Sequence, residues 1–373
     1  MLAAWMLLRV PADAPDLAAA VERAQDGDEI RIEGVVAGGV TIGKRVTLSG
    51  GARGDAPETW GVVRGGGPRA LILTGPVVVR NLRVENPVGH GIRIEAGTPM
   101  VSEVRLDVAE TAFGIVGDAA PVLDRCEVAR CNNGILVLGT ARPHVSDLRV
   151  TAAGGGIVVR ERGAGRFVRH LLVTGRFAAV EVADDAAPDL SAIEIYAATG
   201  AVFVRDRGRP TLTTITVHRC GLAGLEVTGQ ANPDVRGLTI VDCGGAGLHL
   251  HGDARGTYVD IVIRAAVLAG LDLAERAVVA LEQVTVTQSA GAGVYLHDEA
   301  SAEVDFLTVG GTGGPCIDAQ GRATVRVDDG ALTHGLGVAV RAGADAVVTL
   351  CRVGFVGTGG ALVRNGGGRV EVG

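Results

Sequence analysis

The feature that most constrains this chain is a small residue followed by an aliphatic one, which returns at a constant interval. Gly224-Leu225, Gly247-Leu248, Gly270-Leu271 and Gly293-Val294 are each separated by 23 residues. The column continues with small slips at Gly91-Ile92, Gly114-Ile115, Gly134-Ile135, Gly156-Ile157, Ala179-Val180, Ala201-Val202, Cys316-Ile317 and Val338-Ala339. A repeat of this length indicates a solenoid, in which each repeat buries its apolar face by stacking on its neighbours. We therefore predict a stack of about fifteen coils rather than a globular domain.

A proline-led run forms the second element of each coil. Pro121, Pro188, Pro210 and Pro233 each open a pattern close to Pro-x-Leu-x-x-Leu-x-Val. Proline cannot donate a hydrogen bond to a strand ladder, so it marks the start of a strand. The alternation indicates strands, and about 23 residues are too few for a helix and two strands. The predicted fold class is all-β: a right-handed parallel β-helix with about 22–23 residues per coil and an N-terminal capping helix.

The core of such a coil is expected to consist of small aliphatic side chains, because 57 residues are Gly and only 3% are aromatic. Stacking equivalent strands places the residues of one column about 4.8 Å apart along the solenoid axis. The predicted inward columns are Leu225, Leu248, Leu271 and Val294; Val227, Leu250, Leu273 and Leu296; and, from the second strand, Leu238 and Ile240.

The two ends of the chain are expected to differ. Residues 1–27 read as an N-terminal strand over Met1 to Leu8 and a capping helix from Asp16 to Asp26, with an Asp at the N-cap. Residues 28–373 form the β-helix in this prediction, and its C-terminal end is uncapped. Either another chain covers that edge, or the natural protein continues beyond Gly373.

Composition excludes some partners. A net charge of -7 argues against nucleic acid, which would require clustered basic residues. The apolar start is too short to span a bilayer and makes a poor signal peptide, so we predict neither membrane association nor export. The six cysteines include no C-x-x-C pair, which favours reduced thiols in a cytoplasmic protein. Cys131, Cys220 and Cys243 fall in one turn column, which we interpret as small buried residues.

Two N-terminal segments carry a family resemblance. Residues 17–32 and 40–50 resemble the cap and first coils of the pectate-lyase-like superfamily, in its branch of periplasmic copper-binding-like, carbohydrate-binding and sugar-hydrolase repeats. The resemblance implies the β-helix fold but no single activity, since members include lyases, hydrolases, epimerases, phage tailspikes and modules that only bind partners. The pectin-hydrolase signature is not matched, because Gly89-His90-Gly91 and Asp184-Asp185 stand in the reverse order.

Reactive side chains are densest on the outward face of the first strand. One predicted column contains Glu226, His249, Asp272 and Tyr295, preceded by Phe203 and followed by Asp318. The next outward column contains Arg205, His251 and His297. Ladder spacing would put His249 between two carboxylates, each about 5 Å away.

The functional interpretation makes this strip a catalytic site. Glu226 and Asp272 would raise the pKa of His249, and Tyr295 would donate a proton. Phe203, Arg205, His251 and His297 would then bind the substrate. A metal strip with His251 or Asp272 as a ligand is a variant of this interpretation, but we predict that the protein uses no metal and no cofactor. The competing interpretation is a solvated sheet face with opposite charges on neighbouring strands.

Two functional classes therefore stay open, and so does the question of whether the chain is an enzyme. The favoured class is a non-catalytic scaffold or recognition β-helix that binds a protein partner, or associates with itself, through its flat faces or its C-terminal edge. The alternative is a carbohydrate-active lyase, hydrolase or epimerase that acts on a saccharide at the Glu226, His249, Asp272 and Tyr295 ladder. A phage-like or surface adhesin ranks last, because no heptads or trimerisation segment are present.

Overall fold

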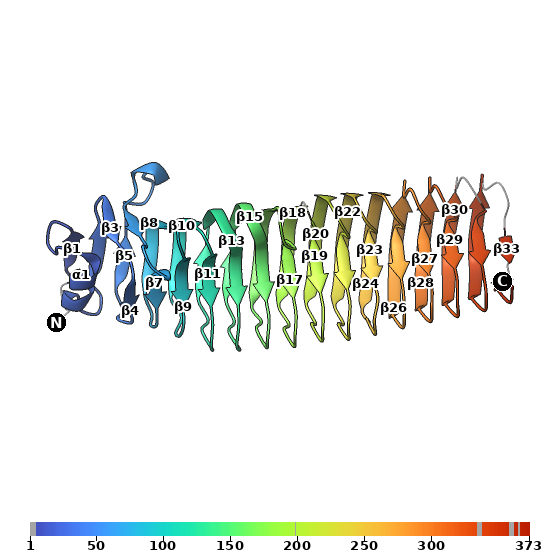
Figure 1. Ribbon diagram of the computed structural model, residues 1–373, viewed down its shortest axis with the longest axis horizontal. Helices are drawn as coiled ribbons and strands as arrows, with labels where there is room; N and C mark the ends of the chain where they lie inside the picture. Colours follow the sequence, from blue (N-terminus) through green and yellow to red (C-terminus); the bar gives the residue numbers. More distant parts are fainter. Residues whose placement is uncertain (1–4, 198, 334–337, 358–361, 365) are drawn as a thin grey trace. The chain divides into compact units, whose positions relative to one another are not determined.

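The computed structural model describes residues 5–197, 199–333, 338–357, 362–364 and 366–373. It confirms an all-β parallel solenoid of about fifteen turns with one short α-helix near the N-terminus (Figure 1). The chain divides into two compact units, residues 1–176 and 177–373. No described helix has the length and apolar character needed to cross a membrane.

The first unit begins with a strand and the capping helix, followed by short strands and then longer ones. The strand predicted at the start is observed at Leu7–Val10, and residues 1–4 lie outside the described residues. The elements are β1 (Leu7–Val10), α1 (Leu17–Arg23), β2 (Glu29–Ile32), β3 (Val35–Ala37), β4 (Val40–Ile42), β5 (Thr47–Ser49), the 3-10 turn η1 (Pro57–Thr59), β6 (Val62–Arg64), β7 (Arg69–Leu73), β8 (Val78–Asn86), β9 (His90–Ile94), β10 (Met100–Val108), β11 (Thr111–Ile115), β12 (Val122–Asp124), β13 (Glu127–Val137), β14 (His144–Ser146), β15 (Arg149–Val159) and β16 (Arg166–Thr174).

Helix α1 has the predicted N-cap but ends three residues earlier than expected. The Asp16 carboxylate accepts a hydrogen bond from the backbone N–H of Ala19 at 2.8 Å. The helix ends at Arg23 because Ala24 is extended, with ψ at 143°. Lys44, the one lysine of the sequence, donates to three carbonyl oxygens at this end, those of Val21, Glu22 and Ala24, at 2.7–2.8 Å. A cation at a helix C-terminus satisfies carbonyl groups that have no partner within the helix.

The second unit alternates a short strand with a long one, as the two sequence patterns predict. Each strand pairs in parallel with the equivalent strand of the next coil, β19 with β21 and β20 with β22 for example. The elements are β17 (Val180–Val182), β18 (Asp189–Ala197), β19 (Val202–Val204), β20 (Thr211–Cys220), β21 (Leu225–Val227), β22 (Asp234–Cys243), β23 (Leu248–Leu250), β24 (Thr257–Ala266), β25 (Leu271–Leu273), β26 (Val278–Thr287), β27 (Val294–Leu296), β28 (Ser301–Gly310), β29 (Ile317–Ala319), β30 (Thr324–Thr333), β31 (Val340–Ala342), β32 (Val347–Val356), β33 (Leu362–Arg364) and β34 (Arg369–Val372).

All the predicted core columns are buried, with Leu225, Leu248 and Leu250 completely inaccessible. Two members of the repeat column were misplaced. In β11 the residue that pairs with Ile92 and Ile135 is Phe113, not the predicted Ile115. The prediction was two residues too late because this coil is shorter than 23 residues. Val340 pairs with Ile317, so the pair at this coil is Ala339-Val340, one residue later than predicted.

The long strands of the second unit bend at one residue with left-handed backbone geometry. Thr214 is an example, with a φ of 55° between the inward residues Leu212 and Ile215. A straight strand places every second side chain on one face, so two inward residues three positions apart require such a bend. The bend column comprises Ala192, Thr214, Gly237, Asp260, Gln283, Phe306, Asp329 and Arg352.

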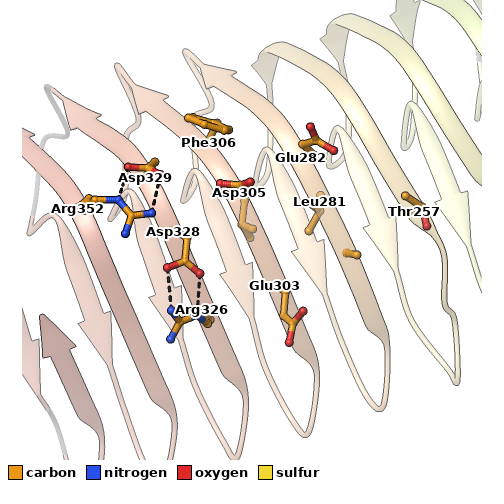
Figure 2. Close-up of a pocket in the computed structure, with 12 residues that line it drawn as sticks. Thr257, Leu281, Glu282, Glu303, Asp305, Phe306, Arg326, Asp328, Asp329 and Arg352 are labelled. Atoms are coloured by element: carbon orange, nitrogen blue, oxygen red, sulfur yellow. Dashed lines mark hydrogen bonds and ion pairs between the residues drawn. The ribbon is translucent and has the colours of Figure 1, made fainter. Parts of the chain in front are cut away.

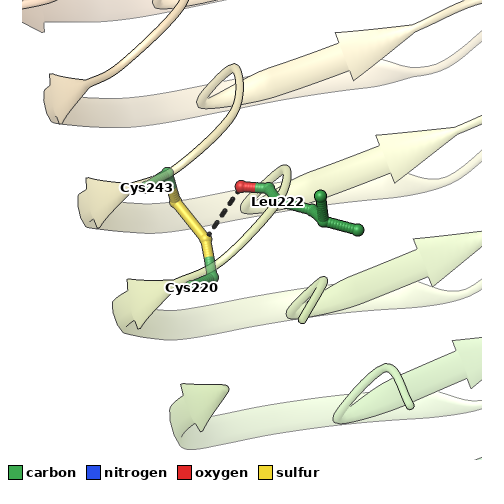
Figure 3. The surroundings of a disulfide bond; sticks show 3 residues. All are labelled: Cys220, Leu222 and Cys243. Carbon is green, nitrogen blue, oxygen red and sulfur yellow. Dashed lines mark hydrogen bonds between the residues drawn. A yellow bond between two sulfur atoms is a disulfide. The ribbon is translucent and has the colours of Figure 1, made fainter. Parts of the chain in front are cut away.

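A disulfide corrects the expectation that the cysteines are reduced. Cys220 and Cys243 end successive long strands and pair in register, with their Cα atoms 4.7 Å apart, and their sulfur atoms are bonded (Figure 3). The expectation was wrong here because parallel stacking brings two cysteines of one turn column within disulfide reach. Among the described residues Cys126, Cys131, Cys316 and Cys351 are free thiols.

We expect this disulfide to contribute to stability, since it closes a loop across 23 residues. Cys220→Ser combined with Cys243→Ser should lower the free energy of unfolding by about 2–4 kcal/mol. Dithiothreitol should lower the thermal midpoint of the wild type but not that of the double variant, with Cys351→Ser as the matched control. Labelling of the unfolded, unreduced protein should modify four of the six cysteines; six labels would contradict the assignment.

Stability of the first unit should depend on pH through His170 in β16. This imidazole is 3% exposed, and its Nδ1 accepts a hydrogen bond from the backbone N–H of Leu148 at 3.1 Å. Burial lowers the pKa of His170 from 6.5 to about 4. The unfolded chain therefore takes up the proton first, so this stability is fully present above pH 6.5 and is lost as the pH falls toward 4.

The loss should amount to about 3 kcal/mol between pH 7 and 4. His170→Asn keeps a hydrogen-bond acceptor without the titration, so its denaturation midpoint in urea should change less over this range. His144→Asn, at an exposed position, is the control and should behave as the wild type. Equal acid sensitivity of the wild type and His170→Asn would contradict the assignment.

Candidate functional site

The predicted reactive column forms as one continuous strip on the second unit, which we call the histidine strip. The short strands β19 to β27 each bury their first and third residues, so the middle side chain faces outward. The register pairs these middle residues one to the next, in the order Phe203, Glu226, His249, Asp272 and Tyr295. Asp318 of β29 pairs with Tyr295 and continues the column, but it is buried.

His251 is the imidazole that makes the charge-assisted contact with Glu226. Its Nε2 lies 3.2 Å from Oε1 of Glu226, and its Nδ1 lies 3.2 Å from the hydroxyl of Thr228. The hydrogen bond to Glu226 raises the pKa of His251, and the same bond lowers the pKa of Glu226. The two groups thus stabilise each other's charged forms.

The predicted rise in the pKa of His249 is wrong. Burial lowers the pKa of this imidazole, and the nearby Asp272 carboxylate offsets that effect only in part. The His249 ring stacks on His251 with ring centroids 4.5 Å apart. The positive charge that His251 can carry lowers the pKa of His249 further. The sequence correctly placed two carboxylates beside His249, but it could not show how far the side chain is desolvated or that His251 lies against it.

Asp272 lies between two imidazoles. Its Oδ2 is 3.9 Å from Nε2 of His249, and its Oδ1 is 3.4 Å from Nε2 of His297. His297 also contacts Asp298 at 2.8 Å and stacks on Tyr295. Burial raises the pKa of Tyr295, with the carboxylates of Asp318 and Asp272 acting in the same direction. The strip therefore places a phenol beside a carboxylate that two imidazoles contact.

Arg205 and Phe203 stand apart from this network. Arg205 donates to Glu181 at 2.9 Å and to Asp206 at 2.6 Å. At the other end of the strip Arg341 pairs with Asp318 at 3.2 Å. Sequence reasoning missed this pair because Val340 had been placed one residue out of register.

A second candidate site, which sequence reasoning missed, is a depression on the bent long strands of the same unit. Its volume is about 480 Å³, within the range of ligand sites. Figure 2 shows Phe306 above it, with Asp305 and Glu282 beside the ring and two Arg–Asp pairs along one edge. We call it the Phe306 depression; its lining is Thr257, Ala280, Leu281, Glu282, Glu303, Val304, Asp305, Phe306, Arg326, Asp328, Asp329 and Arg352.

Phe306 combines an exposed aromatic ring with a left-handed backbone. Its side chain is 52% exposed, and its φ is 59°, in the left-handed region. That region suits Gly, Asn and Asp, and a bulky side chain there is a strained outlier. Phe306 is the one aromatic residue of the bend column. The other members of the bend column share this left-handed geometry, so Phe306 differs from them in being aromatic.

Three carboxylates of the depression lack the basic side chain that most carboxylates of this protein contact. Arg326 binds Asp328, and Arg352 binds Asp329. Within the described residues, Glu282, Glu303 and Asp305 have no cationic nitrogen within 4.0 Å. Register places Glu282, Asp305 and Asp328 on three successive strands, where like charges destabilise the pairing. These free acceptors are thus available to a ligand.

Stacked parallel coils with apolar inward columns and polar outward columns define this protein as a β-solenoid. The family model described as "Right handed beta helix region" matches residues 133–262 and 178–330, which together span more than half of the chain. The chain belongs to this right-handed β-helix family, which confirms the predicted handedness. The pectate-lyase-like branch stays a prediction. No curated protein matches the chain.

Two phage proteins are among the solved structures that the chain matches. Tailspike protein 3 of bacteriophage CBA120 has a TM-score of 0.50 and 13% identity, over 97% of this chain and 57% of the tailspike. The tailspike receptor binding domain of siphovirus 9NA has a TM-score of 0.38 and 11% identity, over 98% of this chain and 76% of that one. This chain thus spans little more than half the length of tailspike protein 3. At this identity the likeness shows the fold alone.

Proposed function

We propose that this chain is a non-catalytic recognition β-helix that binds a neutral saccharide in the Phe306 depression. The observation that carries the proposal is an exposed aromatic ring held in a strained backbone beside carboxylates without partners. An aromatic face packs against the C–H groups of a sugar ring, and carboxylates accept hydrogen bonds from its hydroxyl groups.

The composition of the depression supports a specific class of sugar. Five carboxylates and two guanidinium groups line it, so its charge is negative. An anionic saccharide would meet like charges, whereas a neutral one presents hydroxyl donors to the free carboxylates. Arg326 and Arg352 supply donors for ring and hydroxyl oxygens. We therefore expect neutral glycans to bind better than glycans that contain uronic acids.

Phe306→Asn tests the role of the ring. The variant should lose about tenfold or more in affinity for the bound glycan, because the stacking surface is gone. It should also be as stable as the wild type or more stable by about 1 kcal/mol, because Asn accepts the left-handed geometry. Glycan-array screening followed by calorimetry with the best ligand measures the first effect, and urea denaturation measures the second.

The control for this experiment is Phe203→Ala, which removes the phenyl ring at one end of the histidine strip. It should leave glycan affinity unchanged. A loss of affinity in Phe203→Ala with none in Phe306→Asn would move the binding site to the strip. No binding to any neutral glycan would overturn the proposal. Binding of a protein partner at the flat faces or the C-terminal edge, self-association there, and cytoplasmic location stay predictions.

A carbohydrate-active enzyme is the second candidate function, and one observation favours it. Asp272 lies between His249 and His297 with a phenol next to it, and proton transfer requires such closely spaced titratable groups. Phe203 and Arg205 would bind the sugar beside this centre.

If the strip cleaves or epimerises a saccharide, His249→Ala and Asp272→Ala should each lower the rate by about a hundredfold or more. Reducing-end release and absorbance of unsaturated products measure hydrolase and lyase activity, and NMR measures epimerisation. Phe306→Asn serves as the control on the other face. Activity that survives both strip substitutions would exclude this assignment.

A further inference from the structure

Glu226, His249 and His251 bring three metal-binding side chains together on one face of the second unit. One ligand atom from each can be chosen so that all three lie within 4.8 Å of one another. The side chains of Glu226, His249 and His251 are 34%, 34% and 24% exposed, so solvent and a metal ion can reach them. The site comes from the strand register, which places Glu226 of β21 beside His249 of β23.

The distances suit a small tetrahedral cation. Two ligands at about 2.0–2.1 Å from zinc in a tetrahedral arrangement stand about 3.3 Å apart. His251 Nε2 and Glu226 Oε1 are already 3.2 Å apart. The proton they share occupies the place of the metal, and a cation would displace it. His249 then closes toward the pair by a side-chain rotation.

A neighbouring hydroxyl holds one of the two imidazoles in place. The Thr228 hydroxyl lies 3.2 Å from Nδ1 of His251, which directs Nε2 toward Glu226. Metal-binding histidines commonly have such a partner on the second ring nitrogen, which fixes the tautomer and the ring orientation. The Asp272 carboxylate lies 3.9 Å from Nε2 of His249, beyond hydrogen-bond distance, so His249 keeps the freedom to rotate.

The second unit also contains a similar pair that lacks these features. His218 lies 3.3 Å from Glu194 and stacks on Tyr196, as His251 lies 3.2 Å from Glu226 and stacks on His249. Among the described residues, no other histidine or cysteine and no further carboxylate joins His218 and Glu194 in a metal-binding group. This pair is a two-residue contact on a sheet face, and it supplies a matched control.

We propose that Glu226, His249 and His251 bind one divalent transition-metal ion of the zinc class, with an open fourth position. Two imidazoles and one carboxylate are borderline ligands that suit Zn²⁺ and Co²⁺, whereas Ca²⁺ and Mg²⁺ prefer oxygen ligands alone. This proposal replaces the sequence expectation that no metal binds, and it is independent of saccharide binding in the Phe306 depression.

The test is metal titration of the full chain after treatment with a chelator. Calorimetry with Zn²⁺ should show one ion per chain, and Co²⁺ should give the visible absorption of a tetrahedral complex. His249→Ala, His251→Ala and Glu226→Gln should each weaken Zn²⁺ binding by on the order of a hundredfold. Thr228→Val, which removes only the hydroxyl beside His251, should weaken it by about tenfold.

His218→Ala and Phe306→Asn are the controls and should both bind Zn²⁺ as the wild type does. Circular dichroism of each variant separates a lost ligand from a lost fold, and Thr228→Val keeps the shape of the side chain. No Zn²⁺ binding by the wild type would overturn the proposal, and so would an equal loss in His218→Ala and His251→Ala. Zinc binding retained in Phe306→Asn after its glycan binding is lost would show that the two sites are separate.

Discussion

The parallel hydrogen-bonded ladder between equivalent strands is the constraint on which the second unit depends. It fixes the register of each coil on the next, so each residue has a neighbour of the same column about 4.8 Å away. Inward columns become stacks of Leu, Ile and Val, and outward columns become rows of side chains from different parts of the chain. Functional groups separated by 23 residues therefore become neighbours, as Glu226, His249 and Asp272 do.

The same ladder explains how the surface handles its charge. Arginine side chains reach back one coil to a carboxylate with two hydrogen bonds each, as in Arg130 to Asp107, Arg276 to Asp253 and Arg352 to Asp329. Lysine lacks the fork that makes such a pair possible, which fits a chain with a single lysine. Such exposed pairs are screened by water and add little to stability. Glu282, Glu303 and Asp305, which have no cationic partner among the described residues, therefore matter as hydrogen-bond acceptors.

The bend column and the disulfide are two features that the sequence repeat alone did not predict. The pattern Leu-x-x-Leu contains an odd step that no straight strand can accommodate, and one left-handed residue absorbs it. Phe306 occupies such a bend, and its side chain is exposed there although it is apolar. Similarly, two cysteines of one turn column looked like small buried residues. Only the distance between their Cα atoms showed that they are within bonding range.

By itself the sequence determined the fold class, the core columns, the N-cap at Asp16 and the order of residues along the histidine strip. These follow from backbone pairing and from the burial of apolar side chains, and both repeat with the coil. The tertiary structure decided which imidazole contacts Glu226, the direction of the pKa shift of His249, the arrangement of three metal-binding donors and the depression around Phe306. Those properties depend on side-chain rotation and local desolvation, which change from one coil to the next and leave no periodic signal in the sequence.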